Sequence, residues 1–125
     1  MHFIQSTAAH VLTIMAFIAM ASADVMGNDW SNAGKCASKN ADANAAIEAF
    51  CSKGDIIIPS DYAKNGVNVG GMVAKVNGDC GWQWLPPAWC RAQFHAVCAQ
   101  GGQHGGGYRQ FNGCQNFHIM RVKYN

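Results

Sequence analysis

The sequence predicts an α+β fold, in which a small disulfide-stapled antiparallel sheet packs with two helices in the order α-β-β-α-β-β. Three observations support this prediction. Six cysteines occur in a chain of 125 residues, two segments repeat apolar residues at helical spacing, and several short runs of strand-forming residues end at turn-forming pairs. This combination is typical of an antiparallel sheet that helices cover on one face.

The first 23 residues are typical of a secretory signal peptide. Val11–Met20 is an apolar run in which Thr13 is the one polar residue, and Ala21-Ser22-Ala23 follows with the small-x-small pattern that signal peptidase accepts. No Lys or Arg precedes the run, so an uncleaved anchor is the alternative, but the run is shorter than the roughly 20 apolar residues of a membrane span. We therefore expect a signal peptide at 1–23 and a secreted, extracellular domain at 24–125, with no stable membrane insertion after cleavage.

The cysteines indicate disulfides rather than a thiol site. All six lie in residues 24–125, and an even number in a short secreted chain is typical of a disulfide framework. Six cysteines allow 15 pairings, among which the sequence does not choose. The cysteines are Cys36, Cys51, Cys80, Cys90, Cys98 and Cys114.

The first half of the domain is expected to contain one helix and one strand. Asp24–Asn40 is rich in Asn, Ser, Gly and Ala, which predicts irregular structure. A helix is predicted over Ala43–Lys53, with Asp42 as its N-terminal cap and Gly54 at its end. Ile56–Ile58 is a β-branched run that a proline stops, and it predicts a strand.

The middle of the chain is expected to form a loop and a hairpin. Ser60–Gly71 is predicted to be a loop because it contains Asn-Gly and Gly-Gly pairs. Met72–Val76 alternates like a strand, and Asn77-Gly78 after it is typical of a hairpin turn. Trp82–Leu85 would be the partner strand.

The last third is expected to contain the second helix and a second hairpin. Two prolines precede the predicted helix at Ala88–Ala99, and a glycine follows it. Gly101–Gly107 is expected to be a mobile connector, with a binding lip carrying His104 as the alternative. Tyr108–Tyr124 predicts a hairpin that turns at Asn112-Gly113.

Composition and spacing argue against several classes of protein. Nine Lys and Arg stand against seven Asp and Glu with no basic run, so we expect no nucleic acid as a partner. Neither predicted helix is basic and amphipathic, which argues against membrane disruption. His95, His104 and His118 are far apart in the sequence, and cysteines in disulfides do not bind zinc as thiolates. We therefore expect no metal and no cofactor.

The sequence offers weak grounds for an enzyme. Ribonuclease chemistry needs a histidine base, a second acid and a cation, and His95, His118 and Arg109 offer these groups, but nothing local brings them together. No local pattern pairs the few carboxylates for glycoside hydrolysis, and no Gly-x-Ser-x-Gly motif occurs. We expect a binding protein without catalytic residues, and a small secreted hydrolase is the least favoured alternative.

The aromatic and amide side chains around residues 77–89 favour glycan binding. Aromatic rings can stack on the apolar face of a sugar while polar side chains bond its hydroxyls. Trp82 and Trp84 are two apart on a predicted strand and therefore share one side of it; an exposed side would make a platform, and a buried side, the commoner outcome, would make core. The predicted ligand residues are Trp82, Trp84 and Tyr108 for stacking, and Asp79, Gln83 and His104 for hydrogen bonds.

Several motifs resemble those of small secreted cysteine-rich proteins of filamentous fungi. The resemblance covers about residues 43–119 and describes a scaffold more than an activity. The stretches that carry it are AAIEAFCSK at 45–53, IPSDY at 58–62, LPPAWC at 85–90, QFHAVC at 93–98, the glycine pair at 101–102 and GCQNF at 113–117.

Within this group the chain is similar to the mushroom glycan-binding lectins of mixed α/β fold and, more weakly, to fungal killer toxins. The first resemblance implies recognition of a glycan or glycoprotein bearing fucose or N-acetylgalactosamine, without catalysis. The alternative function is that of an effector- or toxin-like protein that targets a host or competitor protein.

Overall fold

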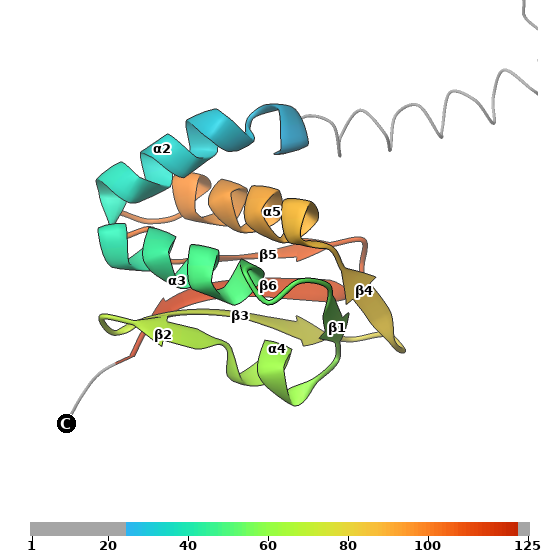
Figure 1. Ribbon diagram of the computed structural model, residues 1–125. Helices are drawn as coiled ribbons and strands as arrows, with labels where there is room; N and C mark the ends of the chain where they lie inside the picture. Colours follow the sequence, from blue (N-terminus) through green and yellow to red (C-terminus); the bar gives the residue numbers. More distant parts are fainter. Residues whose placement is uncertain (1–24, 123–125) are drawn as a thin grey trace, which may run out of the picture.

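The fold is α+β, as predicted, with helices packed on antiparallel strands (Figure 1). The computed structural model describes residues 25–122, so the predicted signal peptide lies outside the described residues. The helices are α2 (Asp29–Lys39), α3 (Ala41–Cys51), α4 (Asp61–Asn65) and α5 (Pro87–Gln100). The strands are β1 (Ile56–Ile58), β2 (Val67–Val69), β3 (Met72–Gly78), β4 (Gln83–Leu85), β5 (Gly107–Phe111) and β6 (Gln115–Arg121).

The strands form two antiparallel sheets. The larger has the strand order β2-β3-β6-β5, and the smaller consists of β1 and β4. Along β6 the side chains alternate between two environments, because successive residues of a strand point to opposite faces. Phe117 and Ile119 are buried, whereas Met120 is exposed and His118 is half-buried. The sequence predicts that Phe117 and Ile119 share one side of this strand and that His118 and Met120 share the other.

Helices α3 and α5 cover the buried face of the larger sheet, and α2 packs on α5 (Figure 1). The centre of the core is aromatic. Phe94 of α5 contacts Phe50 of α3 and Phe117 of β6 edge-on, with ring centroids 5.3 and 4.7 Å apart, a geometry that the ring quadrupoles favour. Within residues 25–122 no helix is long and apolar enough to span a bilayer.

All six cysteines form disulfides, as expected. Two of the bonds attach α5 to the other long helices, one near each end, and the third joins the segment after β3 to the turn between β5 and β6. The pairs are Cys51–Cys90, Cys36–Cys98 and Cys80–Cys114. This is one of the pairings that the sequence leaves open.

The two helices and the last hairpin of the prediction are present. The helix predicted over 43–53 spans Ala41–Cys51, and the one predicted over 88–99 spans Pro87–Gln100. The hairpin turns at Asn112-Gly113, whose φ angles of 58° and 70° are those that an Asn-Gly pair adopts readily. The cap of α3 differs from the prediction: Asn40, not Asp42, accepts hydrogen bonds from the first free N–H groups.

The prediction that residues 24–40 are irregular is wrong for most of the segment, because α2 occupies Asp29–Lys39. Trp30 is the one large apolar residue of this helix and Cys36 its one buried residue, so the repeated large apolar residues that mark the buried face of most helices are missing. Contacts with α5, including the disulfide to Cys98, supply the stability that the local sequence lacks.

Two further predictions are wrong in the middle of the chain. Ser60–Gly71 contains α4 and β2 rather than an unstructured loop. The segment 72–76 does not pair with 82–85: β3 pairs with β2 and β6, and β4 pairs with β1. The chain does not turn back at Gly78, where it passes so close to β1 that an added Cβ would lie 2.6 Å from Cγ2 of Ile58. The long pairing with β6 overrides the local turn signal.

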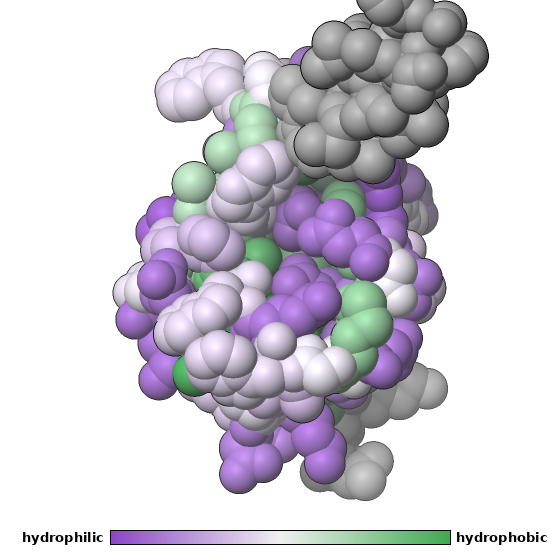
Figure 2. Space-filling view, turned by 90° about the vertical axis from the view of Figure 1, so that its right-hand side faces the viewer, coloured by the Kyte–Doolittle hydropathy of each residue, from purple (hydrophilic) through white to green (hydrophobic). Residues whose placement is uncertain are grey.

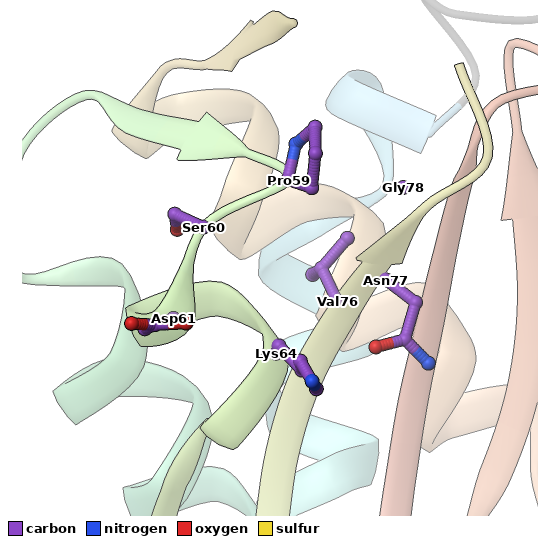
Figure 3. A pocket seen from close by; sticks show the side chains of 7 residues that line it. All are labelled: Pro59, Ser60, Asp61, Lys64, Val76, Asn77 and Gly78. Atoms are coloured by element: carbon purple, nitrogen blue, oxygen red, sulfur yellow. The ribbon is translucent and has the colours of Figure 1, made fainter. Parts of the chain in front are cut away.

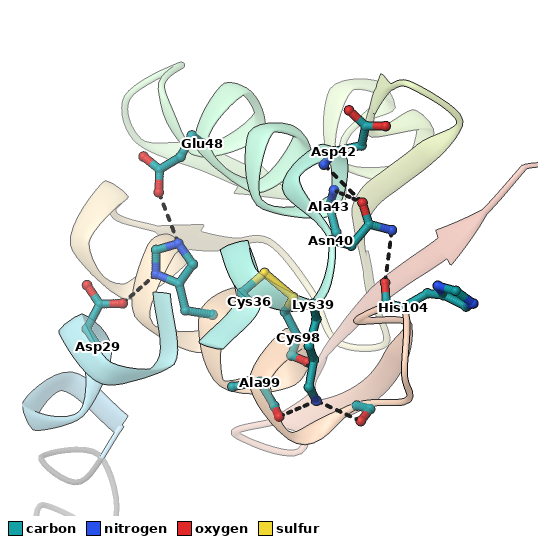
Figure 4. Close-up of a disulfide and its surroundings, with 12 residues drawn as sticks. Asp29, Cys36, Lys39, Asn40, Asp42, Ala43, Glu48, Cys98, Ala99 and His104 are labelled. Carbon is teal, nitrogen blue, oxygen red and sulfur yellow. Dashed lines mark hydrogen bonds and ion pairs between the residues drawn. A yellow bond between two sulfur atoms is a disulfide. The ribbon is translucent and has the colours of Figure 1, made fainter. Parts of the chain in front are cut away.

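Lys39 joins the end of α2 to the end of α5. Its Nζ donates hydrogen bonds to the carbonyl oxygens of Ala99 at 2.5 Å and Gly101 at 3.0 Å (Figure 4). The last carbonyls of a helix lack helical partners and carry the negative end of its dipole. The ammonium group therefore donates hydrogen bonds to carbonyl oxygens that would otherwise have no partner at the C-terminal end of α5.

His95 of α5 lies between two carboxylates from the other long helices. It is 2% exposed, its Nδ1 is 2.5 Å from Oδ1 of Asp29, and its Nε2 is 3.0 Å from Oε2 of Glu48 (Figure 4). This arrangement links α2, α5 and α3 through one imidazole: Nδ1 is hydrogen-bonded to Asp29, whereas Nε2 lies close to the Glu48 carboxylate without forming a hydrogen bond.

We expect Lys39→Met to lower the free energy of unfolding by about 1–2 kcal/mol, because the variant keeps the aliphatic stem but loses charge-assisted hydrogen bonds. Urea denaturation of the oxidised protein measures the change. Lys64→Met, which alters an exposed lysine in the last turn of α4, is the matched control. Equal stability of the two variants would contradict the capping role.

Candidate functional site

The structure distributes the six predicted ligand residues over three places. Trp82, Gln83 and Trp84 lie in or beside β4. Tyr108 and Asp79 are connected through side chains on the exposed face of the larger sheet. His104 lies in the glycine-rich segment after α5. The six residues therefore do not form one site.

Trp84 of β4 and Trp82, which directly precedes this strand, are both exposed. Trp82 is 61% and Trp84 53% exposed, and their rings meet edge-on with centroids 4.9 Å apart. The sequence favoured a buried position for these rings. They are exposed because β4 pairs only with β1 in the small sheet, and Leu85, the neighbour that points the other way, takes the buried position.

A pocket opens beside Trp84, and we call it the tryptophan–amide pocket. It has a volume of about 310 Å³ and lies between β4, the N-terminal half of α5 and the β5–β6 turn. Its lining consists of two tryptophans, two apolar residues and three carboxamides. These residues are Trp84, Leu85, Pro86, Trp89, Gln93, Asn112 and Gln115.

Gln93, one of the residues that line this pocket, carries a buried hydrogen-bond acceptor without a partner. The residue is 6% exposed, and its Oε1 has no hydrogen-bond partner in the described part of the chain. A buried acceptor without a partner costs about 1–3 kcal/mol, and in native proteins such groups are rare. Among the residues that line the pocket, Gln93 is the one with such an atom.

The neighbouring amide is satisfied within the protein. Nε2 of Gln115, a residue that is 4% exposed, donates a hydrogen bond to Oε1 of Gln83 at 3.0 Å. This bond fixes β6 against β4 at the edge of the pocket. Gln83 therefore supports the wall of the pocket through Gln115.

The sequence contained a signal for this pocket that the prediction did not use. Trp89 and Gln93 are four residues apart on a predicted helix, so they share one face of it. The β5–β6 turn supplies Asn112, and no spacing rule brings that residue to α5. Only the paired strands and α5 together assemble the lining.

On the exposed face of the larger sheet, Tyr108 and Asp79 belong to one hydrogen-bonded group. The Tyr108 hydroxyl donates to Oδ1 of Asn116 at 2.8 Å, and Nδ2 of Asn116 donates to Oδ2 of Asp79 at 2.6 Å. Nε2 of Gln110 donates hydrogen bonds to Oδ1 of Asn116 at 2.8 Å and to Oδ2 of Asp79 at 3.2 Å. These side chains mainly satisfy one another.

His104 is held far from the tryptophans. Its carbonyl oxygen accepts a hydrogen bond from Nδ2 of Asn40 at 3.1 Å, and its ring points away from the Cys36–Cys98 disulfide (Figure 4). It follows the C-terminal end of α5 at Gln100, whereas Trp89 lies near the N-terminal end, about 16 Å from Gln100 along the helix axis at 1.5 Å per residue.

The glycine-rich segment is a hydrogen-bonded turn and not a free connector. The N–H of Gly102 donates to the carbonyl oxygen of Gly106, and that of Gly105 to the carbonyl oxygen of Gly102. Gly105 is buried, has a φ of +77°, and leaves no room for a Cβ, which would lie 2.7 Å from Sγ of Cys98. Glycine is needed here because the turn packs directly on the disulfide.

The three residues considered for ribonuclease chemistry do not meet. His95 is buried between Asp29 and Glu48. Arg109 lies over the ring of Phe111 and donates a hydrogen bond to Oε1 of Gln100 at 3.3 Å. His118 projects from the exposed face of β6, where its ring lies 4.7 Å from that of Tyr108. In residues 25–122 no group of three or more His, Cys, Asp or Glu side chains is arranged to hold a metal ion.

A larger hollow of about 530 Å³ lies between α4 and β3 (Figure 3). Asp61 and Lys64 at its rim are exposed, and Oγ of Ser60 already accepts a hydrogen bond from the N–H of Ala63 at 3.1 Å. No aromatic residue and no buried polar atom without a partner is among its described lining residues. The tryptophan–amide pocket is therefore the better candidate site.

Comparisons with known proteins assign no family to the chain. No protein-family model matches it, and no curated protein or solved structure is significantly similar to it.

We expect an NMR titration to find the pKa of His118 below its usual value of about 6.5. Burial lowers this pKa, and so does the positive charge of Lys75, which lies opposite His118 in the β3–β6 register. Lys75→Gln should raise the pKa without restoring the usual value, since burial is the larger cause.

The same shift makes stability depend on pH. As the pH falls through 6.5 towards the pKa of the folded state, the unfolded chain binds more protons, so the folded state loses stability. His118→Gln removes this contribution, which urea denaturation at several pH values will measure. A pKa above 6.5, or one that Lys75→Gln leaves unchanged, would contradict the assignment.

Proposed function

We propose that this chain is a secreted glycan-binding protein and that the tryptophan–amide pocket is its binding site. The observation that carries the proposal is the buried, unpartnered Oε1 of Gln93, a residue that lines a pocket together with two tryptophans. The carbonyl oxygen of an amide accepts hydrogen bonds. A ligand that donates one from an O–H or N–H group would therefore remove the free-energy penalty of leaving this oxygen buried without a partner. Sugars carry such donors beside an apolar C–H face.

The geometry of the pocket supports a small organic ligand. Its volume of about 310 Å³ lies at the lower end of the range of roughly 300–1,000 Å³ that is common for ligand pockets. Trp84 is exposed and Trp89 half-buried, so both can offer ring surface to a sugar. Trp82, whose ring contacts that of Trp84 edge-on, extends the aromatic surface beyond the pocket.

The chemistry of the lining favours binding over catalysis. Of the described residues that line this pocket, none has a titratable side chain, whereas glycoside hydrolysis requires a carboxyl pair. The carboxamides of Gln93 and Asn112, for which no hydrogen bond within residues 25–122 takes the place of a ligand as one does for Gln115, offer donors and acceptors to hydroxyl groups. A neutral sugar ring fits this lining better than an anionic ligand.

The disulfides support both secretion and a preformed site. Three disulfides in so short a chain are typical of proteins from oxidising compartments, and we propose a fungal extracellular protein on the resemblance described above. Cys90, one residue after Trp89, is bonded to Cys51, which fixes the helical wall of the pocket. A rigid site loses less entropy on binding.

The second candidate is an effector- or toxin-like protein that acts on another protein. The observation that favours it is Trp30 on α2, which is 92% exposed. Against this, the surface over β4 and the N-terminal end of α5 is not one broad apolar patch: Figure 2 shows strongly hydrophilic residues interleaved with weakly polar and apolar ones. Mixed surfaces of this kind suit polar ligands, and large apolar patches suit protein partners.

A glycan array with the secreted, oxidised protein tests the proposal. We expect selective binding that free sugar competes away, and we expect Trp84→Ala to weaken it at least about tenfold, the usual effect of removing a central aromatic contact. Trp30→Ala is the matched control and should leave binding unchanged. A folded wild-type protein that binds no glycan, or equal losses in both variants, would overturn the proposal.

Gln93→Met provides a sharper test because it replaces the unpartnered amide by an apolar side chain of similar shape. We expect the variant to bind glycan more weakly by about tenfold, the cost of one buried hydrogen bond. Its melting temperature should be at least as high as that of the wild type, because a buried polar atom without a partner has been removed. A loss of both stability and binding would indicate a structural role for Gln93 instead.

A further inference from the structure

The hollow between α2, α5 and β5 has the opposite chemistry to the tryptophan–amide pocket. It has a volume of about 410 Å³, and its lining includes two cations and no carboxylate. The polar residues that line it are Asn28, Ser31, Asn32, Lys35, Gln100 and Arg109. We call this region the cationic hollow.

The two cations of the cationic hollow have no acidic partner. Within residues 25–122, neither Lys35 nor Arg109 forms an ion pair with a carboxylate. Arg109 is held by the ring of Phe111 and by Oε1 of Gln100, both neutral groups. Both side chains come from exposed residues, so their charges can reach a ligand.

The surrounding helix ends also favour an anion. The hollow lies at the first turn of α2, the positive end of that helix dipole. The one carboxylate that α2 contains, on Asp29, is directed to His95. The negative end of α5 is next to Gln100, but Lys39 bonds its last carbonyl oxygens and so reduces their repulsion of an anion.

We propose that the cationic hollow binds an acidic saccharide through a sulfate or carboxylate group. The guanidinium of Arg109 offers a planar fork that fits either oxyanion, and the ammonium of Lys35 adds a second positive charge. Ser31, Asn32 and Gln100 offer hydrogen bonds to the hydroxyls of the same sugar. No aromatic ring lines the hollow in the described part of the chain, so it lacks the stacking surface on which nucleic-acid bases bind.

This site is independent of the proposed glycan pocket. It uses the C-terminal half of α5, through Ala96 and Gln100, whereas the tryptophan–amide pocket uses the N-terminal half, through Trp89 and Gln93. The two sites share no lining residue. A variant of one site should therefore leave the other intact, and the failure of one proposal can be distinguished from the failure of the other.

Isothermal titration calorimetry on the secreted protein, with two tetrasaccharide probes, tests the proposal. One probe is a heparin-derived tetrasaccharide, which carries sulfates as well as carboxylates, and the other is a hyaluronan tetrasaccharide, which carries carboxylates alone. Binding of either supports the proposal; binding of the heparin probe alone identifies sulfate as the required group, and binding of both shows that a carboxylate is sufficient. Neutral chitotetraose should not compete. Binding should weaken as salt rises, because exposed charges are screened.

The double variant Lys35→Gln/Arg109→Gln should bind the acidic probe at least about tenfold more weakly, since two charge-assisted contacts are lost. The matched control is Lys53→Gln/Arg121→Gln, which removes the same charge outside the hollow and should bind as the wild type does. Trp84→Ala should also bind the acidic probe normally. Melting curves verify that every variant is folded, and Arg109→Lys, which keeps the charge but loses the planar fork, should retain part of the affinity.

Three results would overturn the proposal. They are no binding of either acidic tetrasaccharide to the folded protein, equal losses in the two double variants, and equal binding of the neutral probe. The second of these would show that general positive charge, and not the cationic hollow, attracts the anion.

Discussion

Helix α5 is the element on which the rest of the structure depends, and two disulfides fix it near its ends. Cys90 joins it to α3 and Cys98 joins it to α2. Eight of its 14 residues are buried, which few helices in so small a protein could achieve without covalent support, because small domains bury a limited share of their surface. Both candidate sites lie along this helix, so the disulfides that stabilise the fold also position the sites.

The polar residues of α5 show how structural and functional groups can be distinguished. His95 is buried, its Nδ1 is hydrogen-bonded to Asp29, and its Nε2, although it forms no hydrogen bond, lies 3.0 Å from the Glu48 carboxylate. These two carboxylates account for His95 as part of the fold. Gln93, two residues earlier, is buried to a similar extent, yet its Oε1 has no partner in the described part of the chain. A protein that keeps such an atom loses stability, and a ligand that bonds it offers a reason to keep it.

The separation of β4 from the larger sheet explains why the tryptophans are available. Had Gln83–Leu85 paired with β3, as the Asn-Gly turn signal predicts, Trp84 would be part of the larger sheet. Pairing with β1 instead places it at the edge of the molecule, where its ring is 53% exposed. The Cys80–Cys114 disulfide holds the segment before β4 against the β5–β6 turn, so that Asn112 and Trp84 can line the same pocket.

The sequence by itself determined two of the long helices, the last hairpin and the cross-linked character of the protein, but not α2, α4 or β2. Apolar spacing and glycine stops predicted α3 and α5 to within about two residues, and Asn112-Gly113 predicted the last hairpin, because these signals act over a few neighbouring residues. Tertiary structure decided the disulfide pairing, the existence of α2, the partners of β3 and β4, and the exposure of Trp82 and Trp84. These features depend on contacts between residues far apart in the chain, as the 62-residue separation of Cys36 and Cys98 illustrates. The same reason explains why the six predicted ligand residues separate, while Trp89, Gln93 and Asn112 come together.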